Sequence, residues 1–368
     1  MSVIPAAHPT RRRALRAWTG LLAIVLLALP LDPLPGQSAK AATAALAQQP
    51  GQATGGAEEA NPRANFWRAV RQGNAGYSAV AGPEAGVLIH SAGQNWRALR
   101  NGPLTLYGGW LLAGVAAAVL LFHLLHGRVR LERGPSGLTV PRWKAVERLL
   151  HWWTAILFLV LAITGASLLF GRHLLIPLIG KDAFAAWAAL AKSLHNYGGP
   201  GFAVGLVLEI LLWVRHNIPT KVDLVWLTKG GGIVGSGHPS AGRMNGGEKL
   251  WFWMLATAGL ALIASGLVLN FPNFEQSRGQ MQLAHLLHAG TSLVVMAFAI
   301  GHIYIGTLGT EGSLQGMLTG RVDAEWAKQH HDLWYQALLE RGDRPEPRAT
   351  SRQRAATKRP RPAQPGTG

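Results

Sequence analysis

The sequence predicts an all-α integral membrane protein, with a four-helix transmembrane bundle and one extra N-terminal transmembrane helix. Of its 368 residues, 49% are hydrophobic and only 14% are charged, and the mean hydropathy is +0.16. The charged residues gather in blocks that separate long neutral runs. Each run is longer than the roughly 18 to 20 residues that a helix needs to cross a bilayer.

Five apolar runs define the predicted spans. Four of them contain no Asp, Glu, Lys or Arg, and the third span has one carboxylate, Glu209. The predicted spans are 104–125, 149–171, 194–215, 250–271 and 285–307.

The N-terminus has the features of a secretory signal. Several arginines precede the apolar stretch GLLAIVLLALPL (20–31), and small residues at 39–41 and 45–47 offer cleavage sites. We therefore expect a cleaved signal peptide, since the apolar run is short for a membrane span. An uncleaved anchor is the alternative.

Basic residues set the predicted orientation. They crowd 126–148 and the segment after 308, whereas 272–284 has one arginine, so the first two segments are expected in the cytoplasm. Five spans then place the segment before the first span outside, as a cleaved signal also requires. The predicted segments are a signal peptide (1–47), a periplasmic segment (48–103), an extra transmembrane helix (104–125), a cytoplasmic linker (126–148), the transmembrane bundle (149–307), a cytoplasmic tail (308–340) and a basic disordered tail (341–368).

Charge and cysteine content exclude several classes of protein. The net charge of +17 lies mainly beside membrane spans, which argues for topology and anionic headgroups rather than nucleic acid as the partner. The chain has no cysteine, which excludes disulfides, cysteine-bound iron–sulfur clusters and covalently attached haem. Any redox centre must be non-covalent and bound by histidine.

Four histidines lie near the ends of the predicted spans at matching depths. His288 and His302 are 14 residues apart, which puts them within roughly 40° of the same helix face and about 21 Å apart along the axis. The predicted topology places His151 with His302 at the cytoplasmic level. It places His195 with His288 at the outer level.

Two stacked bis-histidine pairs are what two b-type haems require, because each iron takes neutral imidazole nitrogens from opposite sides. Gly165 and the GGPG stretch (198–201) fall near the outer pair, where small residues leave room for a macrocycle or simply pack helices. Two other uses of the histidines remain open. They are interhelical hydrogen bonds in a haem-free anchor, and a zinc or iron transporter, although a transporter favours carboxylates near the midplane.

Several motifs, in order and spacing, resemble the gamma subunit, a cytochrome b, of membrane-bound formate dehydrogenases. The resemblance covers about 140–340. It rests on ERLLHWWTAILFLVLAITG, SLHNYGG, RHNIPTKVDLVWL, GRMNGGEKLWFW, LLHAGTSLVVMAFAIGHIYI and EGSLQGMLTGRVDAEWAKQHHDLWY.

This resemblance implies a function and a set of partners. Formate would be oxidised on a molybdenum or tungsten alpha subunit, and electrons would pass through an iron–sulfur beta subunit to this chain. The chain would carry them through two non-covalent b haems to a quinone in the bacterial inner membrane. The close alternative is the cytochrome b subunit of a hydrogenase or another periplasmic oxidoreductase.

The resemblance also assigns site residues, none of them catalytic for formate oxidation. The outer haem would use His195 and His288, and the inner haem His151 and His302. The quinone would bind beside the inner haem, at a position that maps to Asn245 and Gly247. On sequence alone, Asn-Gly-Gly at 245–247 is an ordinary turn.

Glu209 departs from the family pattern. It lies 14 residues after His195 and should therefore face the bundle near the inner haem. We expect it to carry protons to the quinone or to pair with a cation, because carboxylates inside a membrane are costly. The alternative is a side chain that reaches the cytoplasmic interface.

Overall fold

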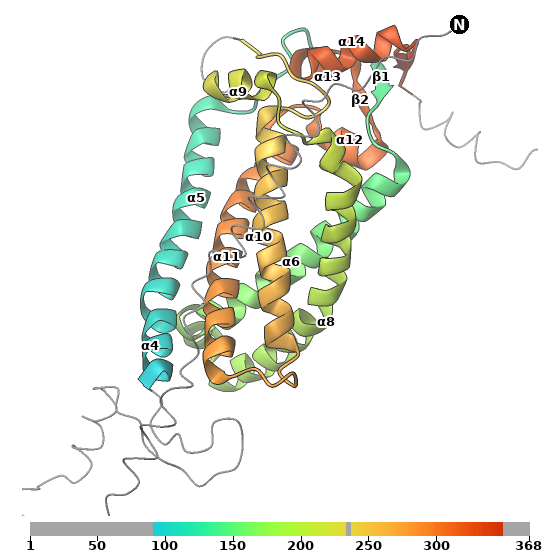
Figure 1. Ribbon diagram of the computed structural model, residues 1–368. Coiled ribbons are helices and arrows are strands. Elements are labelled where there is room, and N and C mark those ends of the chain that lie inside the picture. Colours follow the sequence, from blue (N-terminus) through green and yellow to red (C-terminus); the bar gives the residue numbers. More distant parts are fainter. Residues whose placement is uncertain (1–90, 233–236, 349–368) are drawn as a thin grey trace, which may run out of the picture. The chain divides into compact units, whose positions relative to one another are not determined.

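The computed structural model describes residues 91–232 and 237–348, so the predicted signal peptide and most of the periplasmic segment lie outside the described residues. Five helices in these ranges are long and apolar enough to cross a membrane, as the sequence predicts. They are α5 (Thr105–His126), α6 (Ala145–Leu174), α8 (Lys181–Trp213), α10 (Gly246–Asn270) and α11 (Arg278–Tyr304) (Figure 1).

The bundle helices begin earlier than the predicted spans because their polar ends are also helical. The first turn of α6 has a capping box, in which Glu147 accepts a hydrogen bond from the backbone N–H of Lys144. Ser277 and Gln280 form a similar box at the start of α11. The segment 172–193, between the second and third predicted spans, is thus largely helix, formed by the end of α6, the short α7 (Ile176–Ile179) and the start of α8.

The bundle packs as two helix pairs, α6 with α8 and α10 with α11, and α5 lies against α11. The helix α4 (Ser91–Leu99) and the π-helical turn η1 (Arg100–Leu104) lead directly into α5. Trp96 of α4 meets the ring of His285 edge-on, at 5.4 Å between ring centres. The predicted extra span is therefore attached to the bundle along α11.

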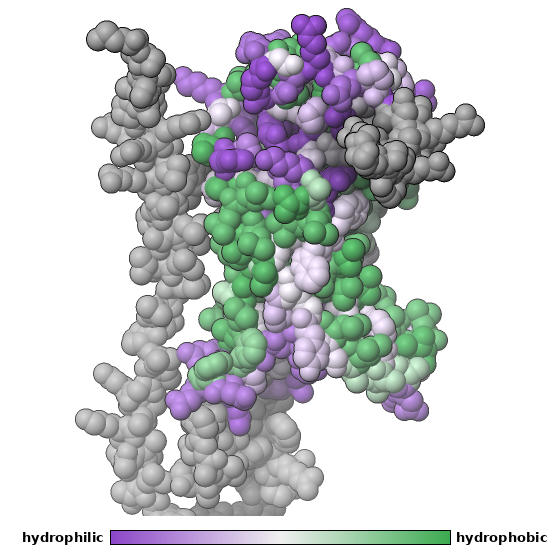
Figure 2. All heavy atoms as spheres, turned by 90° about the vertical axis from the view of Figure 1, so that its right-hand side faces the viewer, coloured by the Kyte–Doolittle hydropathy of each residue, from purple (hydrophilic) through white to green (hydrophobic). Residues whose placement is uncertain are grey.

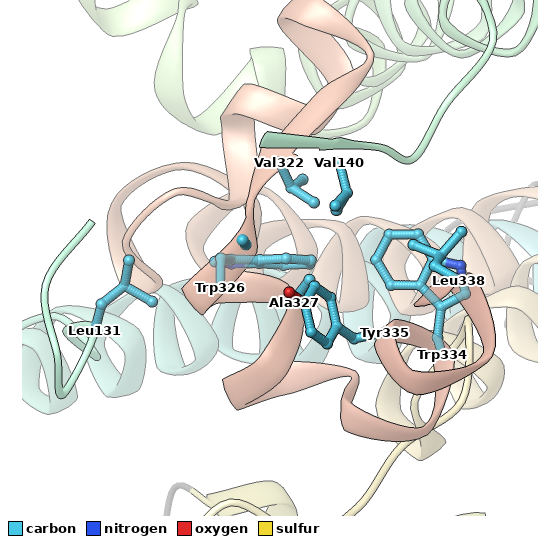
Figure 3. Close-up of a cluster of buried hydrophobic side chains, with 9 residues drawn as sticks. Leu131, Val140, Val322, Trp326, Ala327, Trp334, Tyr335 and Leu338 are labelled. Atoms are coloured by element: carbon cyan, nitrogen blue, oxygen red, sulfur yellow. The ribbon is translucent and has the colours of Figure 1, made fainter. Parts of the chain in front are cut away.

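A small domain, which we call the cap, covers the end of the bundle at which α6 begins and α11 ends. It contains α12 (Ser313–Thr319), α13 (Ala324–His330) and α14 (Asp332–Glu340), with a sheet of β1 (Leu138–Pro141), β2 (Arg321–Asp323) and β3 (Glu346–Pro347). The strands are antiparallel in the order β2-β1-β3, with Val140 opposite Val322. These two valines pack with Trp326, Trp334 and Leu338 in a buried core (Figure 3).

The cap corrects two predicted boundaries. The predicted linker 126–148 and tail 308–340 form one folded unit rather than separate segments. The tail boundary at 341 is too early, because Glu346 and Pro347 pair with β1. The sequence did not predict these strands, because strands of two to four residues are too short to show an alternating pattern. The all-α prediction therefore holds for the membrane part, and the cap also contains a small sheet.

A buried arginine fastens the cap to the bundle. The Arg142 side chain lies about 5 Å from the rings of Trp143, Trp326 and Trp334 and donates a hydrogen bond of 3.0 Å to Glu248, in the first turn of α10. Burial lowers the pKa of this guanidinium, and the Glu248 carboxylate opposes the shift.

Figure 2 shows hydrophilic residues gathered at the cap end, above a band of hydrophobic residues along the helices.

Candidate functional site

The four histidines singled out in the sequence form two pairs inside the bundle. The ring centres of His151 (α6) and His302 (α11) are 6.4 Å apart, and those of His195 (α8) and His288 (α11) are 6.1 Å apart. We call these the inner pair, at the cap end, and the outer pair. The structure thus brings together the partners that the topology predicts.

In the outer pair, a hydroxyl on a neighbouring helix meets each ring. Thr164 Oγ1 of α6 lies 2.9 Å from His195 Nδ1, and Ser265 Oγ of α10 lies 3.1 Å from His288 Nδ1. The carbonyl of Leu262 is also 3.2 Å from His288 Nδ1. Both hydroxyls are nearly inaccessible to solvent, with Thr164 2% and Ser265 7% exposed.

A glycine follows each hydroxyl and faces the same histidine. A Cβ atom on Gly165 would lie 3.2 Å from His195 Cε1, and one on Gly266 would lie 3.1 Å from His288 Cε1. Both distances are tight for carbon atoms, so a larger residue at either position would push against the ring. The missing side chain at Gly165 therefore lets the His195 ring lie close to the α6 backbone.

The GGPG stretch has the other use that the sequence left open. A Cβ on Gly198 would contact Leu161, and one on Gly201 would contact Leu157, both on α6. These glycines serve the close packing of α8 against α6.

The inner pair has a different environment. Trp251 of α10 stacks on His302, with ring centres 4.7 Å apart and an interplanar angle of 10°. His151 Nδ1 is buried without a hydrogen-bond partner. Within 91–232 and 237–348, no neighbouring hydroxyl holds either ring of this pair as Thr164 and Ser265 hold the outer rings.

Glu209 is buried and points into the bundle rather than toward the interface, with only 6% of its surface exposed. It faces Thr154 of α6, three residues beyond His151. One of its carboxyl oxygens, Oε1, has no hydrogen-bond partner among the described residues. One turn nearer the cap, Trp213 donates a hydrogen bond to the buried Glu147 carboxylate, which lies 3.5 Å from Arg243. Polar groups thus continue from the cap toward Glu209 along the seam between α6 and α8.

Asn245 and Gly247 lie at the N-terminus of α10. Asn245 is the N-cap, and its Oδ1 accepts a hydrogen bond of 2.9 Å from the Glu248 N–H. The amide nitrogen Nδ2 of Asn245 stays available as a donor, as does the N–H of Gly247, which has no carbonyl acceptor within its own helix. Trp226 lies against Gly247, 2.9 Å from the position of an added Cβ. Asn245 and Gly247 lie about 9 Å and about 6 Å along α10 from Trp251, which contacts the inner pair.

Thr164, Ser265 and Trp251 were not predicted from the sequence as part of the site. A signal for the hydroxyls is present, since LAITG (161–165) and LIASG (262–266) share a Leu, a hydroxyl residue and a Gly at the same spacing. Nothing comparable identifies Trp251, because tryptophans are frequent throughout this chain.

The histidine pairs fit a haem held by two imidazoles. A metal ion bound by two imidazole nitrogens on opposite sides, at about 2 Å each, separates the ring centres by roughly 6 Å. Both observed separations match that spacing. In the described part of the chain, no group of three or more His, Asp or Glu residues is arranged to hold a bare metal ion.

Comparison with known proteins agrees with this geometry. A family model described as prokaryotic cytochrome b561 matches residues 142–320. The chain is 29% identical over 205 residues to the nitrate-inducible formate dehydrogenase cytochrome b556(Fdn) subunit of Escherichia coli K12, covering 54% of this chain and 91% of that relative. It is 29% identical over 204 residues to the cytochrome b556(fdo) subunit of the same strain, covering 54% and 93%.

A third relative is the formate dehydrogenase cytochrome b556 subunit of Haemophilus influenzae, 29% identical over 203 residues, covering 53% of this chain and 81% of the relative. The matched region contains α6, α8, α10 and α11 with both histidine pairs. The chain is therefore a multi-pass inner-membrane protein whose residues 142–320 resemble the prokaryotic cytochrome b561 family.

Proposed function

We propose that this chain is the cytochrome b subunit of a formate dehydrogenase and passes electrons from an iron–sulfur partner through two b haems to quinone. A molybdenum or tungsten partner would oxidise formate. The observation that carries the proposal is the pair of stacked bis-histidine sites. The names of the three relatives support formate as the electron source.

The two pairs would hold one haem each. His195 and His288 would bind the outer haem, and His151 and His302 the inner haem. Since His288 and His302 both lie on α11, 14 residues apart, the two sites are separated by about 21 Å along the membrane normal. Haem bound at each pair supplies one-electron redox chemistry.

The quinone would bind at the cap end of α10. Asn245 Nδ2 and the Gly247 N–H are two donors for a quinone carbonyl, and the capping hydrogen bonds between Asn245 and Glu248 fix their direction. Arg142 holds Glu248 in place from the cap. The cap thus positions the donors without contacting the quinone itself.

Glu209 would supply protons to the reduced quinone. Its buried carboxyl lies at the depth of the inner pair, and Glu147 and Arg243 continue the polar seam toward the cap. If the cap is cytoplasmic, as the basic segments predict, quinone takes protons from inside while formate releases its proton outside. The cycle would then build a membrane potential.

Difference absorbance spectra of native membranes test the proposal, in strains with and without this gene. Formate should produce a gene-dependent b-type haem signal close to the one that dithionite produces. A dithionite signal that formate does not elicit, but hydrogen does, would show that the electron donor is a hydrogenase instead. No gene-dependent haem signal with either reductant, in membranes that contain the protein, would contradict the proposal as a whole.

A further inference from the structure

The hydrogen atoms of the outer pair can be assigned from chemistry alone. The Thr164 hydroxyl lies 2.7 Å from the carbonyl oxygen of Val160, and a carbonyl only accepts, so the single hydroxyl hydrogen points there. The lone pairs of Oγ1 then face His195 Nδ1 at 2.9 Å. Nδ1 must therefore be the donor, and Nε2 of the neutral ring is left with a free lone pair.

The same arrangement recurs at His288. Ser265 donates to the Ala261 carbonyl at 2.7 Å, and His288 Nδ1 lies 3.1 Å from Ser265 Oγ and 3.2 Å from the Leu262 carbonyl. Since that carbonyl can accept only, His288 Nδ1 also carries its hydrogen. The two halves of the bundle thus share one arrangement. A hydroxyl donates a hydrogen bond to a carbonyl of its own helix and accepts a hydrogen bond from the histidine of the next helix.

We propose that Thr164 and Ser265 are positioning residues that fix Nε2 of His195 and His288 as the ligand atoms and hold the outer haem at a lower reduction potential than the inner haem. An acceptor on Nδ1–H makes an imidazole a stronger electron donor through Nε2, which favours the oxidised iron. The inner rings have no such hydroxyl. The inference rests on the proposed two-haem function, and it makes electron flow from the outer to the inner site favourable.

Redox titration of the purified complex tests this inference, with the absorbance of both haems and the electron paramagnetic resonance of the oxidised irons as readouts. Thr164→Val and Ser265→Ala each remove one acceptor, and Thr164→Ser keeps it. Thr257→Val is the matched control, because the Thr257 hydroxyl donates to carbonyls of its own helix, Trp253 at 2.8 Å and Met254 at 3.1 Å, without approaching a histidine.

We expect two components in the unmodified protein. Thr164→Val and Ser265→Ala should each raise only the lower of the two reduction potentials. The expected rise is at most about 59 mV, which corresponds to a tenfold change in the equilibrium constant for one-electron reduction. Thr164→Ser and Thr257→Val should match the unmodified protein. If Thr164→Val instead loses one haem that Thr164→Ser retains, the hydroxyl is still shown to hold the outer ring.

Two results would overturn the inference. The first is that Thr164→Val and Ser265→Ala both keep two haems with unchanged reduction potentials. The second is that these substitutions shift only the higher of the two potentials. Equal potentials for the two haems of the unmodified protein would also overturn the inference. One haem per chain would instead contradict the proposed two-haem function, so the haem content tells the two failures apart.

Discussion

The outer and inner histidine pairs have nearly the same spacing but different surroundings. Each outer ring is held by a hydroxyl from a neighbouring helix. In the inner pair, Trp251 stacks on one ring, and the other has an unpartnered nitrogen. Among the described residues, the buried carboxylates Glu209 and Glu147 lie toward the inner level.

If both pairs bind haem as proposed, this difference in surroundings would fit the two sites to separate tasks. The outer site is enclosed by apolar helices, and its two hydroxyls are already engaged, which suits a centre that only passes electrons. The inner pair lies below the cap, and in the proposed function Asn245 would bind the quinone there and Glu209 would supply protons. Similar ligands can therefore serve different chemistry because the neighbouring residues differ.

The largest expected effect is the loss of one haem at a time. His195→Ala should remove the outer haem and leave the inner one, and His302→Ala should do the reverse, because one imidazole alone leaves an axial position open. Haem content per chain and the spectrum of the remaining haem would be measured in both variants.

His285→Ala is the matched control, since His285 lies on the same helix but contacts Trp96. It should keep both haems. If either pair variant also keeps both, the assignment of ligands is wrong for that pair.

The sequence predicted the spans and the pairing because both follow from long-range regularities. Hydropathy locates a span of some 20 residues, and helical periodicity places His288 and His302 on one face. The helix ends were missed because hydropathy does not register polar caps such as Ser277. The cap was missed because its strands are brief and its partners lie far apart in the chain, as Val140 and Val322 do.

The surroundings of the pairs were beyond prediction for a related reason. The contact between Thr164 and His195 joins two helices, α6 and α8. It depends on how each helix is rotated about its own axis, and sequence periodicity gives that rotation only approximately. The burial of Glu209 followed from its 14-residue spacing to His195, but its missing partner did not. The pairing of the four histidines can thus be predicted from spacing, whereas the groups around each pair require the packed structure.

An intermediate effect is expected from Glu209→Gln. If Glu209 supplies protons to the inner site, this variant should slow quinone reduction by about tenfold or more and change its pH dependence, because an amide cannot transfer the proton. The haem spectra and the one-electron reduction of both haems by dithionite should stay normal. Quinone reduction would be followed between acidic and alkaline pH.

Glu275→Gln provides the comparison, since Glu275 is exposed in the loop at the outer end of the bundle. It should leave both rate and pH profile unchanged. If Glu209→Gln has the same rate and pH profile of quinone reduction as the unmodified protein, Glu209 does not supply protons to the inner site.

The smallest effect concerns the cap, which gives the inner end a sensitivity to acid that the outer end lacks. Burial, with help from His238 and Arg142, lowers the pKa of His330 from 6.5 to about 4. Between these values the unfolded chain binds a proton that the folded cap does not, so stability falls as the pH falls from 6.5, by up to about 3 kcal/mol. His330→Gln should flatten this dependence in thermal unfolding followed by tryptophan fluorescence. His173→Gln is the control, because His173 is exposed at the outer end, and it should leave the pH dependence of stability unchanged. If His330→Gln and His173→Gln flatten this dependence equally, acid acts on the whole bundle rather than through the cap.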